Sequence, residues 1–180
     1  MAIRPDMIVH GVADIDFGNL HCDRHIDYFL ADVDNTLAVR GEMSVRHQIA
    51  DGLRSARKQG FIRGLFLVSN TIWDPRGNRT MRVASIAHCV EADGFYCAGL
   101  LQKKPNRIPY QVGLTAMGAT IEQTAFIGDQ LYTDMAGAQA LGLFSILVDP
   151  LGQDNFFTRI NRWRQNRQLV RWYGKHPLAI

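Results

Sequence analysis

Apolar and polar positions alternate along this chain in blocks that predict strands and helices in turn. Short, continuous apolar runs, typical of buried strands, occur at 28–31, 64–68, 94–97, 124–127 and 144–148. Between them, apolar residues recur at helical spacing, which predicts helices over about 45–59, 78–90, 105–116 and 131–141. In the third helix we expect a buried stripe of Ile108, Val112 and Ala116. Strands that alternate with helices indicate an α/β fold, with a mostly parallel sheet covered on both faces.

The length and composition favour a single soluble domain over residues 1–180. A hydrophobic content of 47% with 21% charged residues is typical of a globular chain. We expect a core over about 26–150 and a helical tail over about 155–173, whereas residues 1–27 show no clear period. The chain has no run of 18 apolar residues and no apolar stretch at its start, and its three cysteines lack metal-like spacing. These features predict a cytoplasmic protein with reduced thiols.

The charge is divided unevenly between the body and the tail. Residues 156–180 hold six of the 20 basic residues and no acidic residue. Residues 1–155 therefore carry 14 basic and 17 acidic residues, a net charge of −3. Because the body has no general basic face, we expect no nucleic acid partner.

Polar side chains directly follow three of the predicted strands. Asp32 follows the first apolar run, Ser69 the second and Asp129 the fourth. In open α/β sheets ligands bind beyond the carboxyl ends of the strands, so we expect these side chains to meet at one edge. Each one alone is also explained by turn, loop or helix-cap chemistry. The set predicts a site, because motifs gain weight from their structural context.

This edge has the groups that hydrolysis of a phosphate ester requires. Mg²⁺ prefers oxygen ligands and takes one or two carboxylates, so Asp32 and Asp129 are the predicted pair. A carboxylate nucleophile divides the hydrolysis into two steps through an aspartyl-phosphate. A turn after Asp32 would let Asp34 act as general acid and then as general base. Ser69 and Lys104 would offer a hydroxyl group and a positive charge to the phosphoryl oxygens.

Several positions keep a second interpretation. Lys103 is a rival for the role of Lys104, and Asp34 is also a common turn former. Thr36 is expected to orient the loop by hydrogen bonding. Asp134 lies in the first turn of the next predicted helix, where it either holds the water shell of the metal or complements the helix N-terminus. The alternative function is a binding or scaffold module with a degenerate site, although such a module has no need for Asp34.

Four segments of the chain share their order with the motifs of a known family. They are Asp32-Val33-Asp34-Asn35-Thr36-Leu37, Ser69-Asn70, Lys104-Pro105 and Gly128-Asp129-Gln130-Leu131-Tyr132-Thr133-Asp134. These segments resemble motifs I to IV of the haloacid dehalogenase (HAD) superfamily, and most closely its subfamily IIIA phosphatases of YqeG type. The resemblance covers roughly residues 26–172. An aspartate at the position of Asp34 marks phosphatases and phosphotransferases within this superfamily.

The resemblance implies a HAD-like Rossmannoid three-layer sandwich, Mg²⁺ as cofactor, Asp32 as nucleophile and Asp34 as acid/base. It also implies that Ser69, Asn70 and Lys104 bind the substrate phosphate. The implied metal ligands are the carboxylates of Asp32 and Asp129 and the backbone carbonyl of Asp34.

The spacing of the motifs argues against an inserted cap domain. Thirty-four residues separate Asp34 from Ser69, and another 34 separate Ser69 from Lys104. Each interval has room for a loop, one helix and one strand. We therefore expect an open site, unless a partner chain covers it in an oligomer, and an open site suits a bulky substrate.

The basic tail leaves two interpretations open. At helical spacing Phe156, Ile160, Trp163 and Val170 share one face with arginines around it, a pattern that suits an anionic membrane surface over 156–175. The alternative is a last helix that packs on the sheet with its arginines in solvent. YqeG-type sequences resemble organelle phosphatases that act on phosphatidylglycerophosphate. That resemblance implies a lipid substrate and a peripheral position at the membrane.

Overall fold

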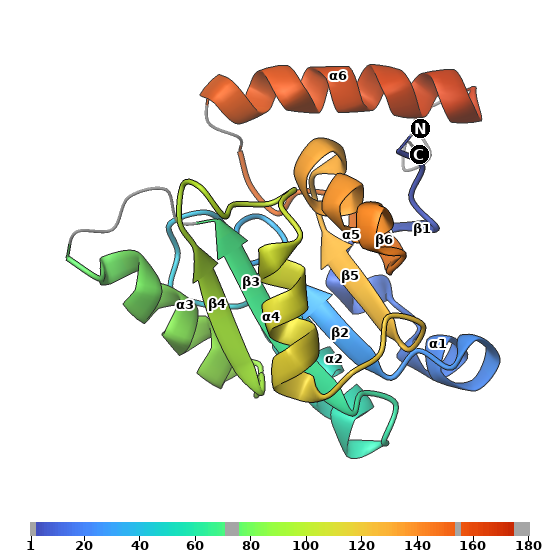
Figure 1. Ribbon diagram of the computed structural model, residues 1–180, viewed down its shortest axis with the longest axis vertical. Coiled ribbons are helices and arrows are strands. Elements are labelled where there is room, and N and C mark those ends of the chain that lie inside the picture. Colours follow the sequence, from blue (N-terminus) through green and yellow to red (C-terminus); the bar gives the residue numbers. More distant parts are fainter. Residues whose placement is uncertain (1–2, 71–75, 154–155, 175–180) are drawn as a thin grey trace.

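The computed structural model describes residues 3–70, 76–153 and 156–174, and these residues form one parallel sheet with helices on both faces (Figure 1). The sheet has six strands in the order β1-β6-β5-β2-β3-β4, and every neighbouring pair runs parallel. The strands are β1 (Met7–Val9), β2 (Tyr28–Ala31), β3 (Gly64–Asn70), β4 (Gly94–Ala98), β5 (Thr124–Gly128) and β6 (Phe144–Val148). The predicted α/β class and the five predicted strands are confirmed.

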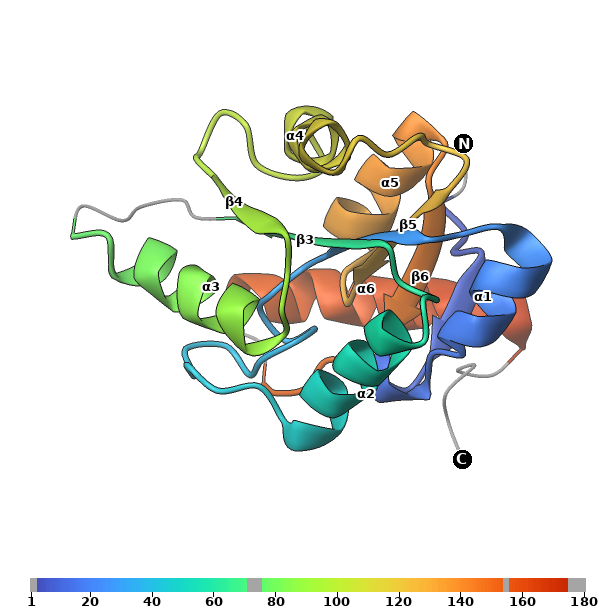
Figure 2. The same ribbon diagram turned by 90° about the horizontal axis from the view of Figure 1, so that it is seen from below.

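Helices cover the sheet in two layers. One face carries α1 (Phe17–Arg24), α2 (His47–Lys58) and α3 (Asn78–Cys89), with the short 3₁₀ turn η1 (Val12–Asp14). The other carries α4 (Ile108–Met117), the π-helical turn η2 (Leu131–Met135), α5 (Ala136–Leu141) and part of α6 (Phe156–Tyr173). Figure 2 shows α4 and α5 on one side of the sheet and α1, α2 and α3 on the other. Each layer buries its own apolar cluster against the sheet.

Three local expectations were wrong. Ser69 and Asn70 belong to β3, which runs two residues beyond the predicted strand. The predicted helix over 131–141 is divided into η2 and α5. The buried face of α4 consists of Pro109, Tyr110, Gly113 and Leu114, whereas Ala116 of the predicted stripe is exposed.

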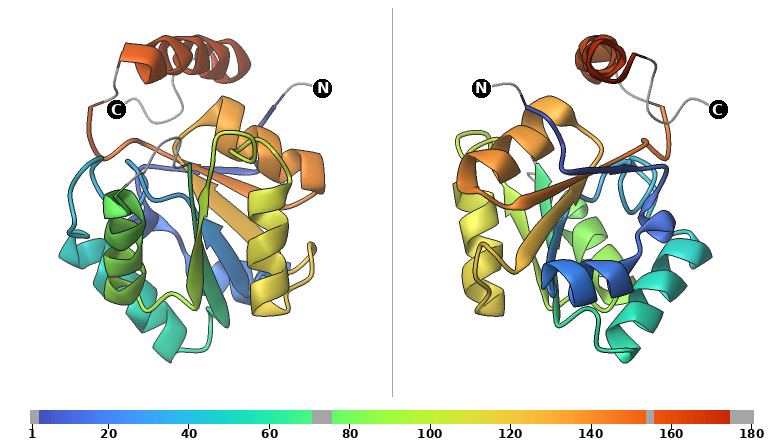
Figure 3. Two further views of the ribbon diagram at one scale, coloured as in Figure 1. Left: turned by 60° about the vertical axis from the view of Figure 1, so that its left-hand side comes forward. Right: turned by 90° about the vertical axis from the view of Figure 1, so that its right-hand side faces the viewer.

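The last helix lies beyond the carboxyl ends of the strands, across the edge where the predicted site residues gather (Figures 1 and 3). It packs through Leu169, which is 1% exposed, and Gln165, which is 5% exposed. Ile160, Trp163 and Val170 of the predicted stripe face solvent. The side chain of Phe156 and residues 175–180 lie outside the described part of the chain. No helix among the described residues is both long and apolar enough to cross a membrane.

Within the described ranges no domain is inserted between the site motifs, so the prediction of a fold without a large cap is confirmed. The edge is nevertheless less open than the spacing predicted, because α6 crosses it.

Candidate active site

Asp32 occupies the centre of the sheet edge. It directly follows β2, whose neighbours are β5 on one side and β3 on the other. The Asp32 N–H donates to the Ile127 carbonyl at 2.9 Å, which continues the pairing with β5. The strand is apolar because both of its faces are covered. Asp32 is the first polar side chain after it, at the point where the chain leaves the core.

Lys104 reaches this carboxylate from the loop after β4. Its ammonium group donates to Asp32, to Asp134 Oδ1 at 2.8 Å and to the Val68 carbonyl at 3.0 Å. The side chain is only 2% exposed, whereas Lys103 faces solvent. Lys104 is therefore the lysine that belongs to this edge.

Asn70 holds the backbone of Lys104 in place. The Lys104 N–H donates to Asn70 Oδ1 at 2.8 Å, and Asn70 Nδ2 donates to the Lys104 carbonyl at 3.4 Å. The Asn70 amide is thus engaged with protein, and its predicted contact with phosphate stays a prediction. Ser69, one residue earlier in β3, is 3% exposed.

Three buried carboxylates gather beside Lys104. Asp32, Asp129 and Asp134 each offer an oxygen, and these oxygens lie within 4.8 Å of one another. Asp129 is 0% exposed and Asp134 is 1% exposed. A cluster of oxygen ligands without histidine or cysteine suits a hard cation such as Mg²⁺. The predicted pair of Asp32 and Asp129 is thus brought together, and Asp134 joins it directly.

The π-helical turn explains how Asp134 reaches the cluster. Its Oδ2 accepts the Gln130 N–H at 3.1 Å, so the carboxylate folds back over the start of η2. A Cβ atom built on Gly128 would lie 2.6 Å from the Cβ and Cγ atoms of Asp134. Glycine at this position therefore leaves the space that the Asp134 side chain fills. Asp134 thus satisfies a backbone N–H at the turn and joins the carboxylate cluster, and its predicted role in the water shell of a metal stays a prediction.

Asp34 lies in a tight loop at the rim of the cluster. Asn35, with φ of 64°, donates its N–H to the Ala38 carbonyl at 2.7 Å and turns the chain back. Arg82 Nη1 donates to Asp34 Oδ1 at 2.8 Å, and the Asp34 side chain keeps 26% of its surface exposed. The Thr36 hydroxyl lies 3.5 Å from Asp32 Oδ2, at the long limit of a hydrogen bond.

Burial and neighbouring charges change the acidity of the central groups. Burial raises the pKa of Asp32 to about 8, although Lys104 acts in the opposite direction, and Asp134, Asp129 and Asp34 add to the rise. Burial would lower the pKa of Lys104, but the Asp134 and Asp32 carboxylates raise it above its ordinary value. Lys104 therefore stays charged, while Asp32 holds a proton near neutral pH until a further positive charge approaches.

Sequence reasoning missed three residues that contact the site. Arg82 of α3 pairs with Asp34, and it also donates to the carbonyl groups of Glu42 and Val39. Arg162 of α6 donates to both the carboxylate and the backbone carbonyl of Asp129. Gln165 Nε2 donates to the same carbonyl at 3.1 Å. No local spacing marks these contacts, because each joins helix and loop residues more than 30 positions apart.

Comparisons with known proteins agree with this geometry. A family model described as HAD-hydrolase-like matches residues 102–150, the segment that carries Lys104, Asp129 and Asp134. The probable phosphatase YqeG of Bacillus subtilis (strain 168) is 27% identical over 166 residues, which are 92% of this chain and 88% of the relative. The chain is thus similar to HAD-hydrolase-like proteins over that segment and to a probable phosphatase over nearly its whole length. The resemblance to YqeG-type HAD proteins that the motifs predicted is confirmed.

Two crystal structures share the fold of this chain. An uncharacterized protein from Listeria monocytogenes serotype 4b has a TM-score of 0.54 at 16% identity, over 73% of this chain and 84% of its own. An uncharacterized protein from Corynebacterium glutamicum has a TM-score of 0.51 at 17% identity, over 83% of this chain and 96% of its own. At these identities the likeness concerns the fold.

Proposed function

We propose that this protein is a Mg²⁺-dependent phosphatase that hydrolyses a phosphomonoester through an aspartyl-phosphate on Asp32. The observation that carries the proposal is the cluster of three buried carboxylates within 4.8 Å, with a buried lysine against two of them. Burial of several like charges lowers the stability of the fold, which argues against a purely structural role for the cluster. The relation to the probable phosphatase YqeG supports the same activity.

The oxygen ligands proposed for Mg²⁺ are the carboxylates of Asp32 and Asp129 and the backbone carbonyl of Asp34. Asp134 is proposed as a further carboxylate beside the ion, directly or through water. When bound, Mg²⁺ neutralises the phosphate ester and the attacking carboxylate, which otherwise repel each other. It also favours the ionised form of Asp32, whose pKa burial raises to about 8.

In the first step an Asp32 oxygen attacks phosphorus and the bond from phosphorus to the ester oxygen breaks. Asp34, as the carboxylic acid, donates its proton to the leaving oxygen. Asp34 is suited to this role because its side chain is 26% exposed at the rim, whereas that of Asp32 is 8% exposed. Lys104 and Ser69 hold the phosphoryl oxygens, and Asn70 positions the Lys104 backbone.

In the second step water attacks phosphorus, Asp34 accepts a proton from that water, and the bond to Asp32 breaks. Inorganic phosphate leaves and the Asp32 carboxylate is restored. Arg82 keeps Asp34 at the rim through its three hydrogen bonds to Asp34, Val39 and Glu42. Thr36 has a supporting role beside Asp32.

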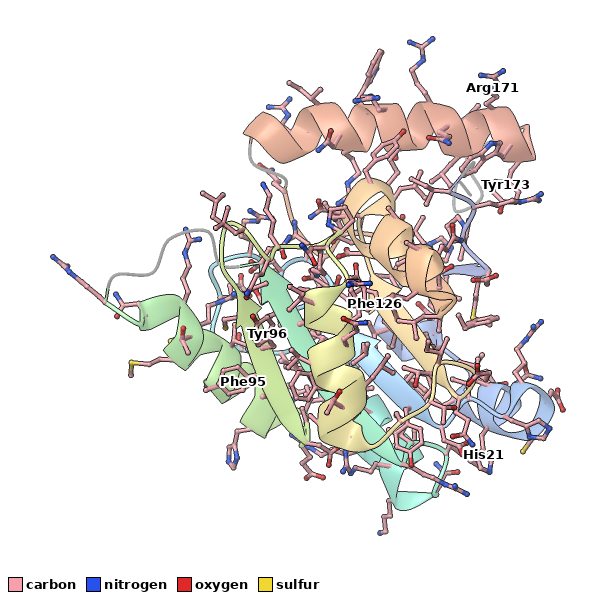
Figure 4. The ribbon with its side chains drawn as sticks, viewed as in Figure 1. His21, Phe95, Tyr96, Phe126, Arg171 and Tyr173 are labelled. Atoms are coloured by element: carbon pink, nitrogen blue, oxygen red, sulfur yellow. The ribbon has the colours of Figure 1, made fainter. Side chains whose placement is uncertain are left out.

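The proposed substrate is bulky, with a lipid phosphomonoester such as phosphatidylglycerophosphate as the leading candidate. The outer face of α6 supports a lipid, because Ile160 and Trp163 are 52% and 59% exposed there. Arg171 extends from the same helix away from the sheet (Figure 4). A groove of about 770 Å³ beside α6 is lined by Tyr132, two tryptophans and three arginines. Aromatic and cationic side chains together suit the interface of an anionic bilayer.

A phosphate-release screen tests the activity. Lipid, sugar and nucleotide monophosphates are offered with Mg²⁺ to the wild type and to Asp32→Asn. We expect release with at least one substrate, and a loss of about a thousandfold or more in the variant, because removal of a covalent nucleophile costs rates of this order. Release that persists at the wild-type rate in Asp32→Asn would refute the nucleophile.

Vesicle co-sedimentation tests the lipid surface separately. Vesicles of phosphatidylcholine alone are compared with vesicles that contain phosphatidylglycerol. We expect the anionic vesicles to bind the wild type, and the double variant Ile160→Ala/Trp163→Ala to bind less. Met81→Ala is the matched control, because Met81 is 68% exposed on α3. Equal binding by all three proteins would remove the proposed membrane surface.

A further inference from the structure

Tyr110 of α4 places a hydroxyl group against the turn that carries Asp134. The residue is 0% exposed, and its ring packs on Phe126 of β5 with the ring centroids 4.8 Å apart. The hydroxyl oxygen lies 2.9 Å from the Thr133 carbonyl and 3.1 Å from the Asp134 carbonyl, so its single proton is shared between two successive carbonyl groups of η2. Burial raises the pKa of Tyr110, and Asp134 and Asp32 act in the same direction, so the hydroxyl keeps its proton and stays a donor.

A glycine in the following helix makes room for this hydroxyl. A Cβ atom built on Gly137 of α5 would lie 2.5 Å from Cζ of Tyr110 and closer still to the hydroxyl oxygen. A larger side chain at position 137 would therefore displace the tyrosine or the helix. A phenylalanine at position 110 would fill the same apolar space without a polar group to satisfy, so packing alone does not account for the hydroxyl.

The wide turn decides where the Asp134 carboxylate lies. The Met135 N–H donates to the carbonyl of Gln130, five positions back, at 3.2 Å, which is the bonding of a π-helix. In an α-helix the acceptor lies four positions back, and each residue gained or lost rotates the helix by about 100°. Closure of η2 to an α-helical turn would therefore rotate its residues relative to α5 and carry Asp134 away from the carboxylate cluster.

Both oxygens of the Asp134 carboxylate depend on this turn. Oδ1 lies 2.8 Å from Lys104 Nζ, and Oδ2 accepts the Gln130 N–H at 3.1 Å. A side chain that inserts beside the carbonyl groups of a helix is one of the known causes of a departure from regular α-helical bonding. The Tyr110 hydroxyl is such a group, because it contacts the carbonyls of Thr133 and Asp134 themselves.

We propose that Tyr110 is a positioning residue for the cation site, whose hydroxyl keeps η2 in its π-helical form and so keeps the Asp134 carboxylate within the cluster. This inference rests on the proposed phosphatase function, in which Asp134 lies beside the ion. It gives a role in cation binding to α4, a helix that supplies none of the three clustered carboxylates.

Calorimetric titration of Mg²⁺ tests the inference without turnover. Tyr110→Phe removes the hydroxyl and keeps the ring that packs on Phe126. We expect Mg²⁺ to bind about tenfold more weakly to this variant, because the loss of a group that orients a metal ligand typically costs about that much or more. Tyr28→Phe is the matched control, since Tyr28 begins β2 at the end of the strand that lies away from Asp32, and it should bind Mg²⁺ as the wild type does.

Hydrogen exchange without metal gives a second readout, which separates positioning from a general loss of packing. The Gln130 N–H donates to Asp134 Oδ2, so its exchange rate reports where that carboxylate lies. In Tyr110→Phe we expect the Gln130 amide to exchange about tenfold faster, while the amides of α4 exchange as in the wild type. Faster exchange throughout α4 would indicate a general loosening and would overturn the positioning role.

The role of Tyr110 and the proposed function fail in different ways. An unchanged Mg²⁺ affinity or an unchanged Gln130 amide in Tyr110→Phe would overturn the role of Tyr110 alone. A wild type that binds no Mg²⁺ would overturn the proposed cation site, and the exchange of the Gln130 amide would still test whether the hydroxyl holds Asp134 in place.

Discussion

Replacement of Lys104 by methionine is the most direct test of the electrostatics at this sheet edge. Methionine keeps most of the length and the apolar stem of the side chain but removes its charge. Lys104 contacts the carboxyl groups of Asp32 and Asp134, whose side chains are 8% and 1% exposed. Removing one partner of a buried ion pair costs about 3–5 kcal/mol, because the remaining charge is left unpaired.

The loss should depend on pH in a direction that the structure sets. Burial already raises the pKa of Asp32 to about 8, and the loss of Lys104 would raise it further. A carboxyl group whose folded pKa lies above its unfolded value loses folding stability as the pH rises from the unfolded to the folded pKa. Below about pH 8 the Asp32 carboxyl is protonated in both proteins, so Asp32 should add to the deficit of Lys104→Met only as the pH rises above about 8, toward the higher pKa in the variant.

Thermal unfolding at several pH values on both sides of pH 8, followed by circular dichroism, measures the effect. Above pH 8 we expect the melting temperature to fall by about 6–20 °C, since each kcal/mol corresponds to about 2–4 °C in a domain of this size. Lys103→Met is the matched control, because Lys103 is exposed and its loss should stay within about 0.5 kcal/mol. A deficit that is equal in the two variants, or one that does not grow with pH, would refute the reasoning.

Three further predictions follow from contacts of the same edge and of α6. Mg²⁺ binding at pH 7 should release close to one proton, and the Mg²⁺ affinity should rise toward pH 8, because burial raises the pKa of Asp32 to about 8 and the ion requires the ionised form. Calorimetry in buffers of different ionisation enthalpy measures the proton release, and zero release would contradict the prediction. Gly128→Ala should lower the free energy of unfolding by about 1–3 kcal/mol, since its Cβ would lie 2.6 Å from Asp134 atoms. Gly52→Ala in α2, with nothing within 4 Å, should be neutral or stabilising by up to about 1 kcal/mol, and equal effects of the two variants in thermal unfolding would count against the close approach. Leu169→Ala should cost about 2–5 kcal/mol and the exposed Ile160→Ala less than about 1 kcal/mol, and the reverse order in urea unfolding would show that α6 packs by its other face.

The central strands and the carboxylates that follow them could be predicted because their signals are local. Each strand is a continuous apolar run, and the polar residue that ends it is visible in the sequence itself. The parallel order of the strands then brings Asp32 and Asp129 together, since β2 and β5 are neighbours. Local pattern and topology together were sufficient for this part of the site.

The α4 stripe was misplaced because a residue without a side chain lies on its buried face. A Cβ built on Gly113 would lie 2.4 Å from Leu30 Cδ2 and 3.0 Å from Phe66 Cδ1, so the helix approaches the sheet closely there. A glycine contributes no hydrophobic signal to a periodic pattern, and the apolar residues on either side predicted a different face. The strand β1 was missed for a different reason, since it is an outermost strand of the sheet and its three residues are only half-buried.

The cations that complete the edge could not be predicted, because their partners are distant in sequence. Arg82 pairs with Asp34 across 48 positions, and Arg162 pairs with Asp129 across 33. A basic residue on a helix looks the same in the sequence whether it faces water or a buried acid. Only the packing of α3 and α6 distinguishes Arg82 and Arg162 from their exposed neighbours.

The strand order also constrains how the chain is assembled during synthesis. Among the described residues the first strand pairs with β6 (Phe144–Val148) alone, so residues 7–9 have no place in the sheet until almost the whole chain has been made. The strand β2, which precedes the proposed nucleophile Asp32, likewise waits for β5 (Thr124–Gly128) before its second edge is covered. A ribosome-bound fragment that ends before residue 124 therefore carries Asp32 but neither Asp129 nor Asp134. Such a nascent chain lacks the cluster of three carboxylates, so the proposed phosphoryl chemistry would require the last third of the polypeptide to have joined the sheet.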